Sequence, residues 1–210
     1  MINPRVWQHL QRPLATVALC GAVALSLQGC IGMVVGTAVM GTLAATDRRT
    51  LGAQTEDQAI MLKGGSRISK LIGDAGHVNI NSYNRKALLT GEVKDDAMKQ
   101  AVEREAAAVE GVQSVDNELE IAGSSGFGSR SNDVLIDGKV KASLVDTKEI
   151  YANSFKVVTE NGVVYLMGRV TQHEGDIAAE VARGVSGVRK VVKVFEYITD
   201  DELKQITHVL

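Results

Sequence analysis

The stretch LLTGEV (88–93) returns later in the chain as YLMGRV (165–170), so an apolar run ending in Gly-Xaa-Val occurs twice. The correspondence continues downstream, where GVQSV (111–115) falls on GVRKV (187–191) at a similar spacing. An internal repeat sets the number of folded units before any fold is assigned. The chain therefore contains one structural unit written twice.

Each copy predicts the order helix, strand, turn, strand, helix, strand. Residues 77–81 alternate with a period of two, which is typical of a strand, and Asn84 and Asn161 stand where hairpin turns are expected. The Ala-, Glu- and Lys-rich residues 95–109 and their counterpart 171–184 predict helices. Two helices on one face of a three-stranded sheet make an α+β fold of about 65 residues, near the lower limit for an independent core.

The bulk composition excludes several classes of protein. The chain has 210 residues, with 23 Lys+Arg against 25 Asp+Glu, and this balance lacks the basic excess of a nucleic-acid-binding protein. Its two cysteines are too few for a disulfide scaffold. The histidines are scattered, and the chain has no HExxH, GxSxG or paired-carboxylate motif. We therefore expect no enzymatic activity, no metal site and no dissociable cofactor.

The N-terminus predicts export and lipid attachment. Two arginines, Arg5 and Arg12, precede an uncharged stretch over 14–28, which is the pattern of a secretory signal. The stretch ends in LQGC (27–30), which resembles the lipobox of bacterial lipoproteins. That resemblance implies that residues 1–29 are a signal peptide and that Cys30 carries N-acyl and S-diacylglycerol groups, which anchor a chain durably. It also implies an outer-membrane destination, because Ile31 rather than Asp follows the cysteine.

Two other interpretations of this region remain open. Residues 14–45 would form one uncleaved transmembrane segment, although their glycines weaken that interpretation, or Cys30 would be an ordinary thiol after a generic signal. We favour a lipidated tether over residues 30–54. Within it, Arg48 and Arg49 are expected to meet acidic lipid headgroups.

The remaining boundaries follow from the repeat and from composition. The two copies occupy residues 55–122 and 132–198. The Gly- and Ser-rich residues 123–131 predict a flexible linker between them, and residues 199–210 predict a short helical extension.

The repeated pattern resembles a known family. The segments VTENGVVYLMG (158–168) and VSGVRKV (185–191) are similar to the BON domain, named for bacterial OsmY and nodulation proteins. A lipobox followed by two such repeats resembles the dual-BON outer-membrane lipoproteins of the division- and outer-membrane-stress-associated lipid-binding type. The resemblance implies binding of anionic phospholipids, a role in envelope integrity at the periplasmic face of the outer membrane, and no catalysis.

The first helix of the second copy, predicted over 133–145, is the candidate lipid site. Asp133 is expected to cap it, and a buried stripe is expected at four-residue intervals (Ile136, Val140 and Leu144). Residues beside that stripe are apolar or basic, which suits a bilayer interface. The predicted lipid-binding residues are Val134, Leu135, Lys139, Lys141 and Val145. A merely solvated helix face is the alternative.

A second hypothesis for the whole chain belongs to a different class. The protein would assist outer-membrane protein or cell-wall assembly through envelope-assembly or division proteins as partners, with lipid contact incidental. The first copy fits this role or a structural one, because its first helix contains Gly64, Gly65 and Gly73, which cost about 1 kcal/mol each against Ala, and its Arg67 and Lys70 are expected to be solvated.

Overall fold

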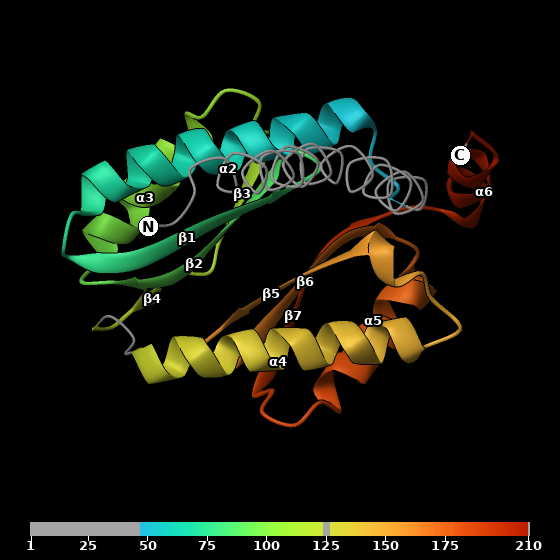
Figure 1. The fold of residues 1–210 in the computed structure, drawn as a ribbon. Coiled ribbons are helices and arrows are strands. Elements are labelled where there is room, and N and C mark those ends of the chain that lie inside the picture. The colour runs from blue at the N-terminus through green and yellow to red at the C-terminus, as the bar shows by residue number, and fades with distance from the viewer. Residues whose placement is uncertain (1–46, 124–126, 210) are drawn as a thin grey trace, which may run out of the picture. The chain divides into compact units, whose positions relative to one another are not determined.

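The computed structural model describes residues 47–123 and 127–209, and residues 46–210 form one compact unit (Figure 1). The predicted signal peptide, Cys30 and the tether up to residue 46 lie outside the described residues. None of the helices within the described ranges is long and apolar enough to cross a bilayer.

The first repeat contains two helices and a sheet. Its elements are α2 (Leu51–Ile72), β1 (Gly76–Tyr83), β2 (Lys86–Val93), α3 (Asp96–Ala107), β3 (Ser114–Asn117) and β4 (Glu120–Ile121). Strand β1 pairs antiparallel with β2, while β3 and β4 both pair parallel with β2. The last strand is interrupted because Leu119 turns into the core, and the Asn117 side chain accepts a hydrogen bond from its backbone N–H.

The second repeat has the same order of elements. It comprises α4 (Phe127–Asp146), a 3-10 turn η1 (Ala152–Ser154), β5 (Phe155–Glu160), β6 (Val163–Val170), α5 (Gln172–Arg183) and β7 (Lys190–Tyr197). Helix α5 begins with a capping box, in which Thr171 and Glu174 satisfy each other's backbone N–H groups. The predicted α+β repeats are confirmed, and a final helix, α6 (Asp200–Val209), occupies the predicted extension.

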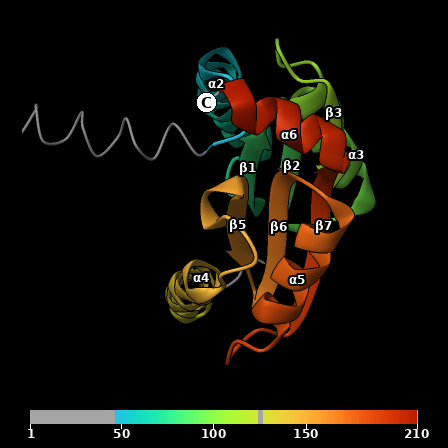
Figure 2. The ribbon, with the colours of Figure 1, turned by 90° about the vertical axis from the view of Figure 1, so that its right-hand side faces the viewer.

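The two sheets pack against each other through the faces that carry no helices (Figures 1 and 2). Helices α2 and α3 cover one sheet, and α4 and α5 cover the other, each over its own apolar cluster. A third cluster lies between the sheets and combines Tyr83 and Leu88 with Val163, Tyr165, Met167 and Val194. Residues 46–210 therefore contain a complete core, and the central strands β2 and β6 are buried on both faces.

An aspartate in the first helix of each repeat holds that repeat's hairpin turn. The Asp57 carboxylate accepts hydrogen bonds from the backbone N–H groups of residues 84 and 85, at 2.7 and 2.8 Å. Asp133 does the same for residues 161 and 162, at 2.9 and 2.8 Å. All four turn residues have positive φ, which leaves their N–H groups pointing away from the strand ladder. The two carboxylates are therefore matching parts of the duplicated fold.

Two predictions about α4 need correction. The helix begins at Phe127, inside the stretch 123–131 that composition predicted to be a linker. Asp133 consequently lies within the helix instead of capping it, and its carboxylate is used by the β5–β6 turn. Glycine and serine lower helix propensity only modestly, and packing of the following turns against the sheet outweighs that cost.

Candidate functional site

Helix α4 buries one face and exposes the other. The predicted core stripe is confirmed, since Ile136, Val140 and Leu144 are all nearly inaccessible to solvent and pack against β5, β6 and α5. The helix therefore has a fixed orientation, and the residues opposite the stripe are held outward by the packing beneath them.

All five predicted lipid-binding residues lie outside the core. Val134, Leu135 and Val145 are 73, 63 and 69% exposed, and both Lys139 and Lys141 are exposed. Large apolar side chains that are exposed close together, unlike single exposed residues, mark a candidate interaction surface. The five side chains therefore all lie on the part of α4 that faces away from the core, and their role in lipid binding stays a prediction.

Two further residues complete this surface. Gly138 and Ala142 are exposed between the larger apolar side chains, so an uncharged strip runs along the helix at steps of four, four and three residues from Val134 to Val145. We call Val134, Leu135, Gly138, Ala142 and Val145 the α4 ridge. The helical period alone could have identified the two small residues, which were overlooked because neither is strongly hydrophobic.

Basic side chains border the α4 ridge on both sides. Lys141 pairs with Asp137 at 2.6 Å, one turn away, while Lys139 lies on the opposite border. The Lys141–Asp137 pair is solvent-exposed on the lysine side, and such pairs contribute at most about 1 kcal/mol. The Lys141 ammonium group can therefore leave the Asp137 carboxylate and bind a phosphate at little cost in free energy.

The prediction that Arg48 and Arg49 meet lipid headgroups was wrong. Arg48 is buried, donates to both Glu174 carboxylate oxygens at 2.8 and 2.5 Å, and donates to the carbonyl of Arg169 at 3.0 Å. The part of the predicted tether that the structure describes, residues 47–54, is thus bound to the second repeat through Arg48. Glu174 outcompetes a membrane surface for the Arg48 guanidinium because its carboxylate is buried and accepts a hydrogen bond at each oxygen.

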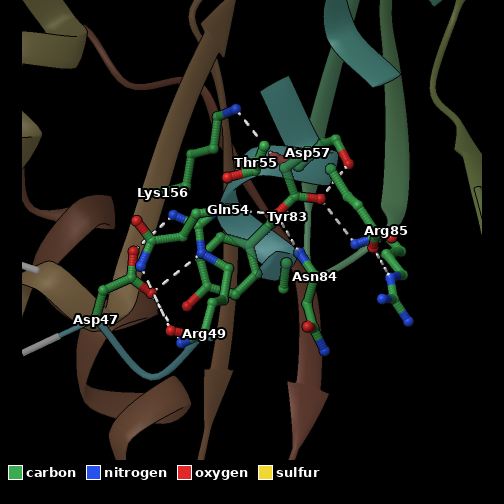
Figure 3. A network of polar contacts seen from close by, with 12 residues as sticks. Asp47, Arg49, Gln54, Thr55, Asp57, Tyr83, Asn84, Arg85 and Lys156 are labelled. Carbon is green, nitrogen blue, oxygen red and sulfur yellow. Dashed lines mark hydrogen bonds and ion pairs between the residues drawn. The ribbon is translucent and has the colours of Figure 1, made fainter. Parts of the chain in front are cut away.

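Arg49 belongs to a polar network at the junction of the two repeats (Figure 3). Its guanidinium pairs with Asp47 at 2.6 Å and with Asp57 at 2.9 Å, and it lies 4.2 Å from the centroid of the Tyr83 ring. Burial raises the pKa of Tyr83 to about 12. Both arginines therefore join parts of the fold instead of remaining available to ligands.

Lys156 from β5 enters the same junction. Its ammonium group donates to the carbonyl of Ser82 at 3.2 Å and lies 3.3 Å from the Met61 sulfur, so it links β5 to the first repeat. Burial lowers the pKa of Lys156 to about 8, and repulsion from Arg49 and Lys141 adds to that effect. A lysine in this position was not predicted, because the junction between the repeats cannot be seen in the sequence of either one.

The first repeat offers a less distinctive surface. Arg67 donates to the carbonyl of Ala108 at 3.2 Å and lies 3.7 Å from Glu105, so it ties α2 to α3. Leu62 on α2 is 75% exposed. Among residues 47–123 and 127–209, no group of three or more His, Cys, Asp or Glu side chains is arranged to hold a metal ion.

Comparison with known families agrees with this architecture. The BON domain family matches residues 65–123 and 132–199, which together cover most of the described chain. The chain belongs to the BON domain family. One match falls within each structural repeat, beginning inside α2 in the first repeat and inside α4 in the second, so α4 is the first helix of the second BON domain.

Several curated proteins are similar over much of their length. The chain is 37% identical to "Outer membrane lipoprotein DolP" of Haemophilus influenzae over 188 residues, which cover 89% of this chain and 97% of that protein. It is 35% identical to the "21 kDa hemolysin" of Actinobacillus pleuropneumoniae, covering 72% of this chain and 79% of the relative. It is 29% identical to "Osmotically-inducible protein Y" of Escherichia coli, covering 54 and 58%.

Among solved structures, the C-terminal domain of CdsD from Chlamydia trachomatis is similar to part of the chain. The match is 13% identical, covers 64% of this chain and 96% of that domain, and has a TM-score of 0.28. A likeness at that level carries no argument about function.

Proposed function

We propose that this dual-BON protein is a lipoprotein anchored through Cys30 to the periplasmic face of the outer membrane, where its second BON domain binds anionic phospholipid and supports envelope integrity. The LQGC motif at 27–30 and the likeness to a protein named an outer membrane lipoprotein support the anchor and its location. No catalytic step is part of the proposal.

The observation that carries lipid binding is the exposed α4 ridge between two lysines. Each large apolar side chain contributes roughly 1.5–3 kcal/mol when fully buried, and insertion to the headgroup boundary captures part of that. Each lysine near an anionic surface adds about 1 kcal/mol. Such a site is weak for a free domain, but an acyl anchor on the same chain keeps the local lipid concentration high.

Flotation at a high vesicle concentration, which replaces the local lipid concentration that the anchor supplies, tests the proposal on residues 46–210, which contain a complete core. We expect this fragment to float with vesicles rich in phosphatidylglycerol and not with phosphatidylcholine vesicles, because the lysines require anionic headgroups. Leu135→Asp should abolish flotation, since it replaces the largest apolar side chain of the α4 ridge by a charge.

The matched control is Leu62→Asp, which changes a similarly exposed leucine on α2, the first helix of the first repeat. Circular dichroism should show both variants folded. Flotation that survives Leu135→Asp, or that both substitutions weaken equally, would reject α4 as the lipid site.

A further inference from the structure

A cavity of about 390 Å³ lies beside α4, between the two BON domains. It is bordered by the edge strand β1 of the first sheet, the edge strand β5 of the second sheet, and α4, all on the same side of the molecule (Figure 2). Its volume lies within the range of small-ligand sites. Val134 and Lys141 line the cavity and also belong to the lipid surface, so the two are continuous.

One end of the cavity contains hydrogen-bond acceptors. Glu160 is buried there, accepts from Asn79 Nδ2 at 2.9 Å and Thr90 Oγ1 at 3.3 Å, and lies 4.0 Å from His77 Nε2. Both of these hydrogen bonds go to Glu160 Oε2, so Oε1 can accept from a ligand group that donates hydrogen bonds.

The other end of the cavity contains an ion pair. Lys141 and Asp137 both line the cavity and are joined at 2.6 Å, and because the Lys141 side chain is solvent-exposed, a phosphate can take the place of the Asp137 carboxylate. Arg130 and Asp133 also line the cavity. Asp133 binds the backbone of Asn161, next to Glu160, and Lys141 is eight residues further along α4, so the two ends are separated by about 12 Å.

We propose that this cavity binds a phosphate ester that carries a hydroxyl or ammonium group at its far end, with the phosphate at Lys141 and the donor at Glu160. This is the chemistry of a glycerophospholipid headgroup, and a lipid whose chains lie along the α4 ridge can place its headgroup there. The inference rests on the proposed lipid binding by α4. It adds that the first BON domain contributes to the site through His77, Asn79 and Asn81 of β1.

Titration with soluble headgroups tests the cavity separately from the α4 ridge. We expect glycerophosphoglycerol, which has no acyl chains, to shift the amide resonances of residues 77–81 and 157–160 in residues 46–210. Phosphoethanolamine tests a ligand whose donor is an ammonium group instead of a hydroxyl. Inorganic phosphate has no donor at a distance from the phosphate, so it should bind several-fold more weakly than whichever of the two headgroups binds more tightly.

Two lysines provide a matched pair of variants. Lys141→Gln should weaken headgroup binding about tenfold, the loss of one charge-assisted bond to phosphate, whereas Lys148→Gln removes the same charge from an exposed lysine outside the cavity lining and should leave headgroup binding unchanged. Equal effects of the two substitutions, no shift at 77–81, or equal affinity for inorganic phosphate would overturn the proposal.

Competition with vesicles distinguishes a lipid headgroup from a free phosphate ester. Phosphatidylglycerol vesicles should displace the soluble headgroup from the wild type but not from Leu135→Asp, which retains the cavity without the lipid contact. Vesicles that bind the wild type without displacing the headgroup would refute the lipid as the cavity's occupant while leaving lipid binding by α4 intact. Vesicles that fail to bind at all would refute the proposed function instead.

Discussion

Replacing Arg48 by Met should destabilise the protein strongly, because the substitution leaves the Glu174 carboxylate buried without its cation. The side chains of the pair are 2 and 9% exposed. Breaking a buried pair by removing one partner costs about 3–5 kcal/mol. Glu174 keeps the backbone N–H of Thr171 as a donor at 2.9 Å, so we expect the lower end of that range.

A loss of about 3 kcal/mol corresponds to a fall in Tm of roughly 6–12 °C for a unit of this size. Thermal unfolding of residues 46–210 at pH 7, followed by circular dichroism, measures it. The double variant Arg48→Met/Glu174→Gln should recover most of the loss, because a neutral glutamine preserves the capping box and needs no cation. A single variant within 2 °C of the wild type (about 0.5–1 kcal/mol), or a double variant no more stable than the single, would refute the reasoning.

The pH dependence gives an independent check on the same pair. Burial opposes ionisation of Glu174, but hydrogen bonds from Arg48 and Thr171 outweigh it and lower the pKa of Glu174 below its ordinary value. A lowered pKa in the folded state contributes stability above the unfolded pKa of about 4.3, and that stability is lost as the pH falls through the folded value. The difference between the wild type and Arg48→Met should therefore be largest at neutral pH and shrink in acid, where a protonated Glu174 needs no partner.

Two further predictions concern Lys156 and Gly138. Because burial lowers the pKa of Lys156 to about 8, the folded state releases this proton before the unfolded state does, so wild-type stability should rise between pH 8 and 9.5 by up to about 1.4 kcal/mol per pH unit. Urea unfolding should show that slope in the wild type and a flatter profile in Lys156→Met, and identical profiles would count against a depressed pKa. Gly138→Ala should raise Tm by a few degrees, because the added methyl group meets open space and alanine is more favourable than glycine in a helix interior by about 1 kcal/mol. A fall in Tm would contradict this prediction, since it would mean that the added methyl group clashes with neighbouring atoms.

The elements of each repeat were predictable because their signals are local. Alternation over 77–81 and the asparagines at the turns placed β1 and both hairpins, and the helical period placed the buried stripe of α4. The predicted exposure of Leu135 followed from the same period. Each of these signals depends on residues within a few positions of one another, and periodicity reports such relations directly.

Other features depend on contacts between distant residues. Asp133 has the composition and position of a helix cap, but the β5–β6 turn binds its carboxylate. The arginine pair suggested a membrane contact in the sequence, yet Arg48 meets an acid 126 residues away. Nothing in the neighbouring sequence distinguishes a cation that will be buried from one that will stay in solvent.

The duplicated pattern by itself determined that the chain contains two α+β units, since each unit's fold is encoded within about 65 consecutive residues. Tertiary structure decided that the helix-free faces of the two sheets pack together, with Tyr83 and Tyr165 in one shared cluster. It also decided that β1 of one domain and α4 of the other border the same cavity. The physical reason is that each sheet leaves one apolar face uncovered by its own helices, and only the folded chain determines what covers it.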